Sequence, residues 1–327
     1  MKSPRDELME LGTALGGFDF VQGPGGNVSV KTDEGELWVK ASGARLRDVA
    51  NDGGHARVPL AEAVAALDGD TTADASLFAR RPRPSLETYF HALPGRVVAH
   101  THPVGAGLIA CSDGRLPRER AGFEVVDVPY RRPGRDLAVT MRELFPEGAR
   151  EVLYVLRNHG VVAIAPTAER AIEITRAFDA SCRALFRDLT DFDRFVRAYL
   201  DAAPTGTEGD LVRSLPPIDA PHGAEPRYLF PDAVVYGSVS YASESPEGAK
   251  GTWLQVDRHG SRRLRARTTR ELDMATEVVA AHDWMAQALE RHGGARHLAP
   301  DEPAAILSLP SERYRMMVLG QRTEGRA

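Results

Sequence analysis

The first part of the chain mixes helical and strand-like patterns of apolar residues. Residues 4–16 place Leu8, Leu11 and Leu15 on one helical face, which predicts an amphipathic helix. Two strand-like segments, 28–31 and 36–40, are separated by a short polar turn and predict a β-hairpin. Further apolar patterns predict helices over 60–67, 85–93 and 168–200 and strands over 97–102, 151–156 and 161–165.

The second part begins with a change of composition. Residues 201–226 are rich in Pro, Gly, Ala and Thr, which predicts a linker. Beyond it, strands are expected over 233–236 and 252–256 and a helix over 271–291. A chain of 327 residues exceeds one ordinary core. We therefore predict a first domain, a linker and a carboxy-terminal extension of unknown role, over residues 1–200, 201–226 and 227–327.

Composition narrows the class of protein. Hydrophobic residues make up 43% and charged residues 27% of the chain, as in globular proteins. The formal net charge of −5 gives no electrostatic reason to expect nucleic acid or an anionic membrane as a partner. Two cysteines make no disulfide framework, and neither a signal peptide nor a run of 18 apolar residues is visible. We expect a cytoplasmic protein.

Two histidines in a predicted strand carry the strongest chemical signal. Residues two apart in a strand point to one face, so His100 and His102 present their imidazoles side by side. An isolated pair of this kind also occurs among ordinary polar residues. His159, which Gly160 follows in a predicted turn between strands, is the best third ligand. Three imidazoles suit a catalytic divalent metal, with Zn²⁺ first and Mn²⁺, Co²⁺ or Fe²⁺ as alternatives.

An acid and several glycine-containing loops complete the candidate chemistry. Glu87 lies at the start of a predicted helix, where the helix dipole favours a carboxylate, and is either an acid/base or a plain first-turn acid. Gly26-Asn27 and Ser42-Gly43 are candidates for anion binding because glycine lets backbone N–H groups approach an anion closely. Lys40 adds a point charge. The plain alternative for both segments is a hairpin loop.

Five motifs in order resemble the class II aldolase/adducin family over residues 5–200: Gly25-Gly26-Asn27-Val28-Ser29, Lys40-Ala41-Ser42-Gly43, Pro84-Ser85-Leu86-Glu87, His100-Thr101-His102 and Asn158-His159-Gly160. The resemblance implies an α/β fold in which a central, largely antiparallel sheet lies between two helical layers, as a three-layer α/β/α domain. Residues 227–327 are expected to form a smaller α+β region. It also implies a homo-oligomer, often a tetramer with sites at subunit interfaces.

The resemblance also assigns roles to single residues. His100, His102 and His159 resemble the family's metal ligands, and Glu87 resembles its acid/base. Tyr130 is one candidate for the tyrosine that delivers a second proton. The anion pocket is expected to use Gly26, Asn27, Lys40, Ser42, Gly43 and Ser85. Leu86 stands where aldolases have a second serine, which removes a hydroxyl donor and puts phosphate as the bound anion in doubt.

These features predict a metal-dependent aldehyde-lyase of carbohydrate metabolism. The substrate expected from the resemblance is a ketose or sugar phosphate that reacts through a metal-stabilised enediolate. An epimerase or decarboxylase with the same metal site is the alternative among enzymes. A non-catalytic, adducin-like interaction module is the alternative outside them, although adducin-type domains lack the three histidines.

Overall fold

The computed structural model describes residues 2–117, 122–218, 226–241 and 251–309, which form two compact units. Unit 1 comprises Met1–Arg187 and unit 2 comprises Asp188–Ala327. The continuous helix expected over 168–200 is two helices, α7 (Ala168–Arg183) and α8 (Phe192–Leu200). Asp188 has a φ of 55°, and the Asp191 side chain accepts the Arg194 N–H and so begins a new helix.

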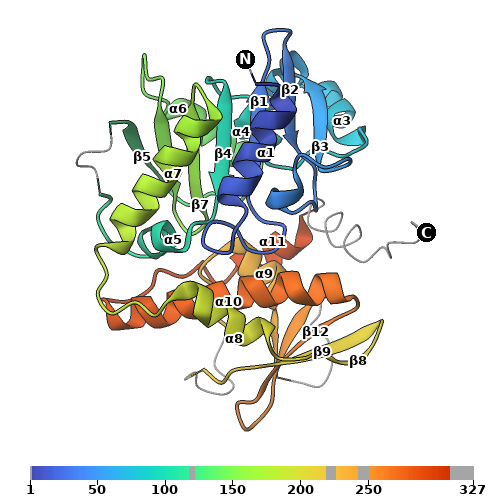
Figure 1. Cartoon of the computed structure of the whole chain (residues 1–327), viewed down its shortest axis with the longest axis vertical. Helices are drawn as coiled ribbons and strands as arrows, with labels where there is room; N and C mark the ends of the chain where they lie inside the picture. The colour runs from blue at the N-terminus through green and yellow to red at the C-terminus, as the bar shows by residue number, and fades with distance from the viewer. Residues whose placement is uncertain (1, 118–121, 219–225, 242–250, 310–327) are drawn as a thin grey trace. The chain divides into compact units, whose positions relative to one another are not determined.

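Unit 1 is built on a seven-stranded sheet in the order β3-β2-β1-β4-β7-β6-β5 (Figure 1). All neighbouring strands are antiparallel except β5 and β6, which are parallel. The sheet is therefore largely antiparallel, as expected. Its strands are β1 (Asn27–Lys31), β2 (Glu36–Lys40), β3 (His55–Pro59), β4 (Val97–Thr101), β5 (Glu124–Val128), β6 (Val152–Leu156) and β7 (Gly160–Ala165).

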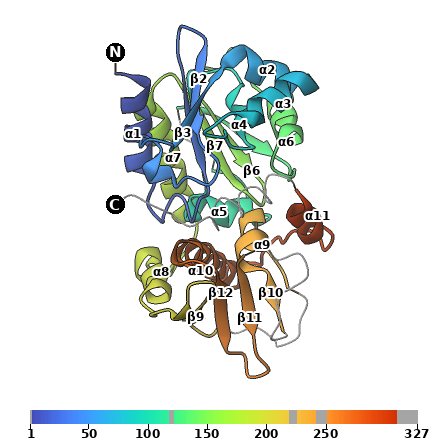
Figure 2. The ribbon, with the colours of Figure 1, turned by 90° about the vertical axis from the view of Figure 1, so that its right-hand side faces the viewer.

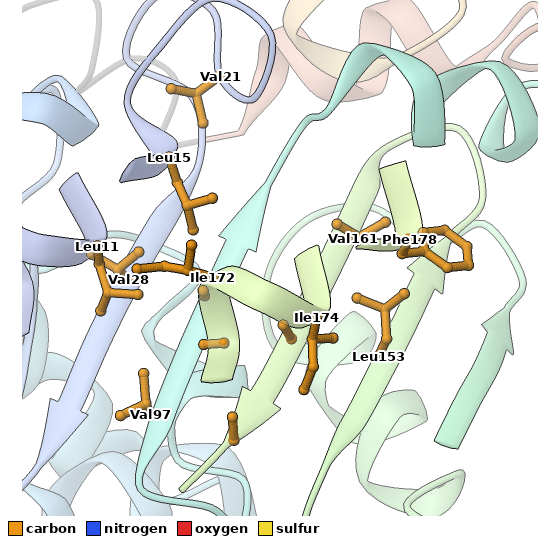
Figure 3. Close-up of a cluster of buried hydrophobic side chains, with 14 of the residues drawn as sticks. Leu11, Leu15, Val21, Val28, Val97, Leu153, Val161, Ile172, Ile174 and Phe178 are labelled. Atoms are coloured by element: carbon orange, nitrogen blue, oxygen red, sulfur yellow. The ribbon is translucent and has the colours of Figure 1, made fainter. Parts of the chain in front are cut away.

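Helices cover both faces of this sheet (Figure 2). One face packs against α1 (Pro4–Leu15), α5 (Val104–Ala110) and α7 around an apolar cluster that includes Leu11, Leu15, Ile172 and Phe178 (Figure 3). The other face has its own apolar cluster with α2 (Leu60–Asp68), α3 (Thr71–Ala79), α4 (Thr88–His91) and α6 (Arg135–Glu143). The predicted three-layer α/β/α architecture is confirmed.

The local sequence explains where α1, the first helix of the outer layer, begins. Pro4 occupies the first turn of α1, and Ser3 and Asp6 form a capping box that satisfies backbone N–H groups at the helix start. The buried residues Leu8, Leu11 and Leu15 then follow the three-to-four-residue spacing of one helical face. The amphipathic pattern read from the sequence therefore positions α1 on the sheet.

Unit 2 contains a smaller sheet in the order β10-β11-β12-β9-β8. Its strands are β8 (Thr205–Thr207), β9 (Asp210–Leu215), β10 (Val239–Ser240), β11 (Trp253–Val256) and β12 (Arg262–Ala266). The helix α10 (Thr269–Arg291) packs on β9 and β12, α8 packs on α10, and α9 (Pro231–Gly237) and α11 (Glu302–Ser308) complete the unit (Figure 2). Within the described ranges, the model contains no helix both long and apolar enough to cross a membrane.

Two sequence expectations for this unit differ from the structure. Residues 233–236, expected as a strand, lie inside α9, in which every residue is buried. A short run buried on all sides has no diagnostic periodicity, and Pro231 at the helix start is the signal that favours a helix. Part of the segment expected as a linker forms β8 and β9, and in β9 Leu211, Arg213 and Leu215 alternate with more exposed residues.

Candidate active site

The sequence-predicted histidines meet at one end of the unit 1 sheet. His100 lies near the end of β4, His102 follows that strand, and His159 lies in the turn between β6 and β7. Their candidate ligand nitrogens all lie within 4.8 Å of one another. The Nε2 atoms of His100 and His102 are 3.0 Å apart. Because two facing lone pairs repel, this spacing requires a proton or a metal ion between the rings.

Backbone contacts orient these rings. His100 Nδ1 lies 2.9 Å from the Val161 carbonyl, to which it can only donate, so Nε2 is the nitrogen that faces the site and can carry either a proton or a metal ion. The backbone N–H of His102 donates to the Phe20 carbonyl at 2.7 Å. A Cβ atom on Gly160 would lie 2.8 Å from the His102 ring and 2.5 Å from the Thr101 carbonyl. Close approach of the rings therefore requires glycine at 160.

The tight turn expected at Gly160 is made two residues earlier, at Asn158. Asn158 has a φ of 55°, the left-handed region that asparagine tolerates better than most residues. Its N–H donates to the Ala110 carbonyl at 3.0 Å, and the His159 N–H donates to the Leu156 carbonyl at 3.0 Å. These contacts leave the His159 side chain directed toward His100, with ring centroids 4.9 Å apart.

Glu87 joins the three histidines from the residue before α4. Its Oε1 atom lies 3.3 Å from His100 Nε2 and 3.4 Å from His159 Nε2. Burial alone would raise the pKa of this carboxyl, but positive charge and hydrogen bonds from His100 and His159 hold the pKa well below 4.5. A metal ion bound between these residues would also lower the pKa of Glu87. The carboxylate is therefore ionised at neutral pH.

The donor set fits a divalent transition metal. Three imidazole nitrogens and one carboxylate oxygen converge, which matches the ligand types that Zn²⁺ and its neighbours prefer. The residues that would hold the ion are His100, His102 and His159, with Glu87 within reach of the same position.

The residues expected to bind an anion also gather near this end of the sheet. Asn27 pairs with His100 across β1 and β4, so the two side chains share a face. A β-bridge between Ala41 and Pro84 places Ser85 beside the turn that follows β2, in which Gly43 has a φ of 78°. Ser42 donates its N–H to the Arg83 carbonyl at 2.8 Å. The predicted pocket residues are thus brought together, while their roles stay predictions.

Asn27 is the most informative member of this group. It is fully buried, and among the described residues neither its Nδ2 nor its Oδ1 atom has a hydrogen-bond partner. A buried amide without partners costs roughly 1–3 kcal/mol, so such a group calls for a ligand or an ordered water. Gly26 has a φ of 66°, and a Cβ there would lie 2.6 Å from Val21 Cγ1 and 3.0 Å from the His100 carbonyl.

Lys40 has a structural contribution that its sequence motif does not show. Its ammonium group is buried and donates to the Pro24 carbonyl at 3.0 Å and to the Ala44 carbonyl at 2.8 Å. These bonds join the glycine-rich loop before β1 to the loop after β2. Lys40 therefore holds together the loop that carries Gly26 and the loop that carries Ser42 and Gly43.

Two other sequence-derived candidates lie in different surroundings. Tyr130 follows β5, an edge strand that β6 and β7 separate from β4, and its role as a proton donor stays a prediction. Leu86 is partly buried against the apolar cluster on the α4 face, and a Cβ on Gly134 would lie 3.7 Å from it. The residue that replaces the family's second serine thus packs within this chain.

Sequence reasoning missed a buried histidine behind Glu87. His91 is fully buried, and its Nδ1 lies 2.7 Å from Ser29 Oγ. Burial holds the pKa of His91 well below 6.5, so the ring is neutral. Ser29 and Lys31 follow Asn27 at alternate positions of β1, and all three are buried. This polar alternation within an otherwise apolar strand is the signal that could have revealed the cluster.

Comparison with known proteins identifies the family of this chain. The family model described as class II aldolase and adducin N-terminal domain matches residues 6–186, more than half of the chain. The chain therefore belongs to the class II aldolase and adducin family. The match lies entirely within unit 1 and covers all of that unit except its first five residues and Arg187. A comparison with curated proteins finds no match.

Several solved structures are similar to this chain. The N-terminal class II aldolase domain of a conserved protein from Thermoplasma acidophilum is 29% identical, with a TM-score of 0.48, covering 57% of this chain and 94% of that one. L-fuculose-1-phosphate aldolase from Thermus thermophilus is 20% identical, with a TM-score of 0.43 and coverages of 55% and 91%. A sugar-phosphate aldolase from Thermotoga maritima is 16% identical, with a TM-score of 0.40 and coverages of 55% and 94%.

Proposed function

We propose that this protein is a metal-dependent lyase of the aldolase type that acts on a ketose or sugar-phosphate-like substrate. The observation that supports this most is the position of Glu87, whose ionised carboxylate lies 3.3 Å and 3.4 Å from the Nε2 atoms of two of the three clustered histidines. This places a proton acceptor beside the position where three imidazoles can hold a cation.

The residues divide the chemistry between them. A divalent metal held by His100, His102 and His159 supplies a Lewis acid for a carbonyl oxygen when it is bound. When the carbon–carbon bond forms, Glu87 takes a proton from the substrate carbon next to that carbonyl. In cleavage, the hydroxyl on the carbon that becomes the aldehyde loses a proton, and Glu87 passes a proton to the carbon next to the carbonyl. Such a proton transfer contributes roughly 10²–10⁴-fold to the rate. Burial of Glu87 keeps bulk water from competing for that proton.

The polar residues beside the histidines suit the anionic end of such a substrate. Asn27 has an amide N–H₂ without a partner among the described residues, and Ser42, Gly43 and Ser85 lie at the neighbouring loops. Because phosphate needs several donors and Leu86 supplies none, the pocket is expected to prefer a phosphorylated ketose only moderately over its unphosphorylated form.

The test is proton exchange in D₂O followed by NMR, with dihydroxyacetone phosphate and dihydroxyacetone as probes and each divalent metal supplied in turn. Wild type should exchange protons of the carbon next to the carbonyl, and Glu87→Gln should not. Glu7→Gln is the matched control because Glu7 is also buried but lies against Arg96. Failure of the metal-loaded wild type to exchange with either ketose argues against an aldolase.

A further inference from the structure

A buried arginine next to the third histidine makes more contacts than its position in the motif suggests. Arg157 is only 9% exposed and follows β6 directly, two residues before His159. Its Nε and Nη2 atoms donate to the two carboxylate oxygens of Asp127 at 2.7 Å and 2.8 Å. Its Nη1 atom donates to the carbonyls of Ile109 at 2.8 Å and Ser112 at 3.0 Å. One guanidinium thus joins β5 to the end of α5.

The helix that Arg157 contacts also connects two of the histidines. Pro103, which follows His102, precedes the first residue of α5, and all seven residues of the helix are buried. At its other end, the Ala110 carbonyl accepts the Asn158 N–H at 3.0 Å. The last carbonyls of a helix lack partners within the helix, and here the β6–β7 turn supplies them. The two ends of α5 therefore lie beside His102 and His159.

We propose that Arg157 is a positioning residue that sets the distance between His102 and His159 and thereby the metal affinity of the site. The inference rests on the proposed metal site. Without the guanidinium, the Ile109 and Ser112 carbonyls lose a charged donor, and fewer contacts, among them the Asn158–Ala110 hydrogen bond, hold the turn to the helix. The His159 ring can then adopt more positions. Because only some of them direct its nitrogen at the metal, the affinity for the metal falls.

A purely structural role for Arg157 makes a different prediction. Arg157 also joins β6 to β5. Its backbone N–H donates to the Val128 carbonyl at 3.0 Å, and its guanidinium pairs with Asp127 in β5. If the side chain only stabilises this sheet edge, its loss lowers the melting temperature and leaves metal affinity unchanged. Arg96→Met is the matched control because Arg96 makes a two-pronged ion pair with Glu7, at 2.7 Å and 2.5 Å, just before the opposite end of β4.

The experiment compares full-length wild type, Arg157→Met, Arg157→Lys and Arg96→Met. For each, the Co²⁺ dissociation constant is measured by competition with a chelator, the visible absorption of the Co²⁺ complex is recorded, and the melting temperature of the metal-free protein is determined. Arg157→Met should bind Co²⁺ roughly 10–100-fold more weakly with altered absorption bands, as expected for loss of a group that orients a ligand. Arg157→Lys should restore part of the affinity, because an ammonium group reaches carbonyls without the two-pronged contact to Asp127.

Arg96→Met should change the melting temperature alone. The inference is overturned if Arg157→Met keeps the wild-type dissociation constant within twofold and the same spectrum. If Arg157→Met does not fold, Arg157→Lys decides, and a change of less than twofold in its affinity overturns the inference. If wild type itself binds no Co²⁺, the proposed metal site is wrong, and the inference about Arg157 is wrong with it. If wild type binds Co²⁺ and the affinity does not depend on Arg157, only the inference is wrong.

Discussion

Two buried carboxylates, one in each unit, are held in the ionised state by different partners. In both, burial alone would raise the pKa, and neighbouring positive charge lowers it below the ordinary value. Glu87 faces the imidazoles of His100 and His159. Asp283 in α10 accepts hydrogen bonds from Arg262 at 2.6 Å and from Tyr199 at 2.8 Å, and one imidazole, that of His282, lies 3.6 Å away.

The difference between these partners separates a chemical site from a structural one. Guanidinium has donors but no lone pair, so Arg262 cannot ligate a metal ion, and Asp283 belongs to no cluster of three possible metal ligands among the described residues. Imidazole can exchange a proton for a metal ion, and the buried Asn27 amide nearby has no partner among the described residues. A lowered pKa therefore does not by itself identify an active site, and the nature of the partners decides.

The largest effect is expected from Glu87→Gln. The amide keeps the shape of the side chain but cannot accept a proton, so turnover should fall by up to about 10⁴-fold, or about 5.4 kcal/mol in the barrier. The fold and most of the metal should remain. Turnover is measured by the NMR exchange assay, and a rate within threefold of wild type would show that Glu87 is not the acid/base.

The next effect is on the folding of unit 2. Asp283→Ala leaves the buried Arg262 guanidinium without its carboxylate and should destabilise the unit by about 3–5 kcal/mol. Replacing both residues, as Asp283→Leu with Arg262→Met, should recover most of that loss because no uncompensated charge is left. Hydrogen exchange of the α10 amides measures the unfolding free energy of the single and the double variant. A cost below about 1 kcal/mol for the single substitution would contradict a structural role for the pair.

Loss of one imidazole should weaken metal binding by at least about 100-fold, or about 2.7 kcal/mol, since a three-ligand site rarely tolerates it. Purified wild type is expected to hold about one divalent metal per chain, and His100→Ala should lose most of it. His55→Ala is the control because that ring stacks on Trp38 instead. Stoichiometric metal in a variant with all three site histidines replaced by alanine contradicts the assignment.

The smallest effect concerns Lys31 and pH. Burial lowers the pKa of Lys31 from 10.5 to about 8. Between these values the unfolded chain binds more protons than the folded one, so the unfolding free energy should rise with pH by roughly 1 kcal/mol per unit. Because the raised pKa values of the buried Cys111 and Cys182 thiols act in the opposite direction, the test is the difference: in denaturant titrations from pH 8 to pH 10 the slope of Lys31→Met should lie below that of wild type by this amount. Lys2→Met, which removes an exposed ammonium group, should keep the slope.

Much of unit 1 and the gathering of its histidines could be predicted because their signals are local. Alternation in 97–102 indicated β4, and spacing two apart brought His100 and His102 together, even though β4 ends at Thr101. Arg157 and His91 could not be recognised, since their contacts with Ile109 and Ser29 join residues more than forty positions apart.

Unit 2 was harder to predict for a different physical reason. The run over 233–236 has β-branched and aromatic residues that favour a strand, but complete burial removed the polar face that distinguishes a helix. In β9, Arg213 occupies a buried position because it donates to Thr276 at 2.8 Å and Asp273 at 2.9 Å. A charged residue at a core-facing position hides the alternation that a strand otherwise shows.

The place of β4 in the sheet bears on how the site is assembled in the cell. Three strands flank β4 on each side, and apolar clusters lie on both faces. Small metal-dependent domains such as zinc fingers are unfolded until the ion arrives. Here two apolar clusters support the strand that carries the histidines, so we expect the domain to fold before the ion arrives, and the choice among available ions then falls to the three imidazoles and to whichever cation reaches them after synthesis.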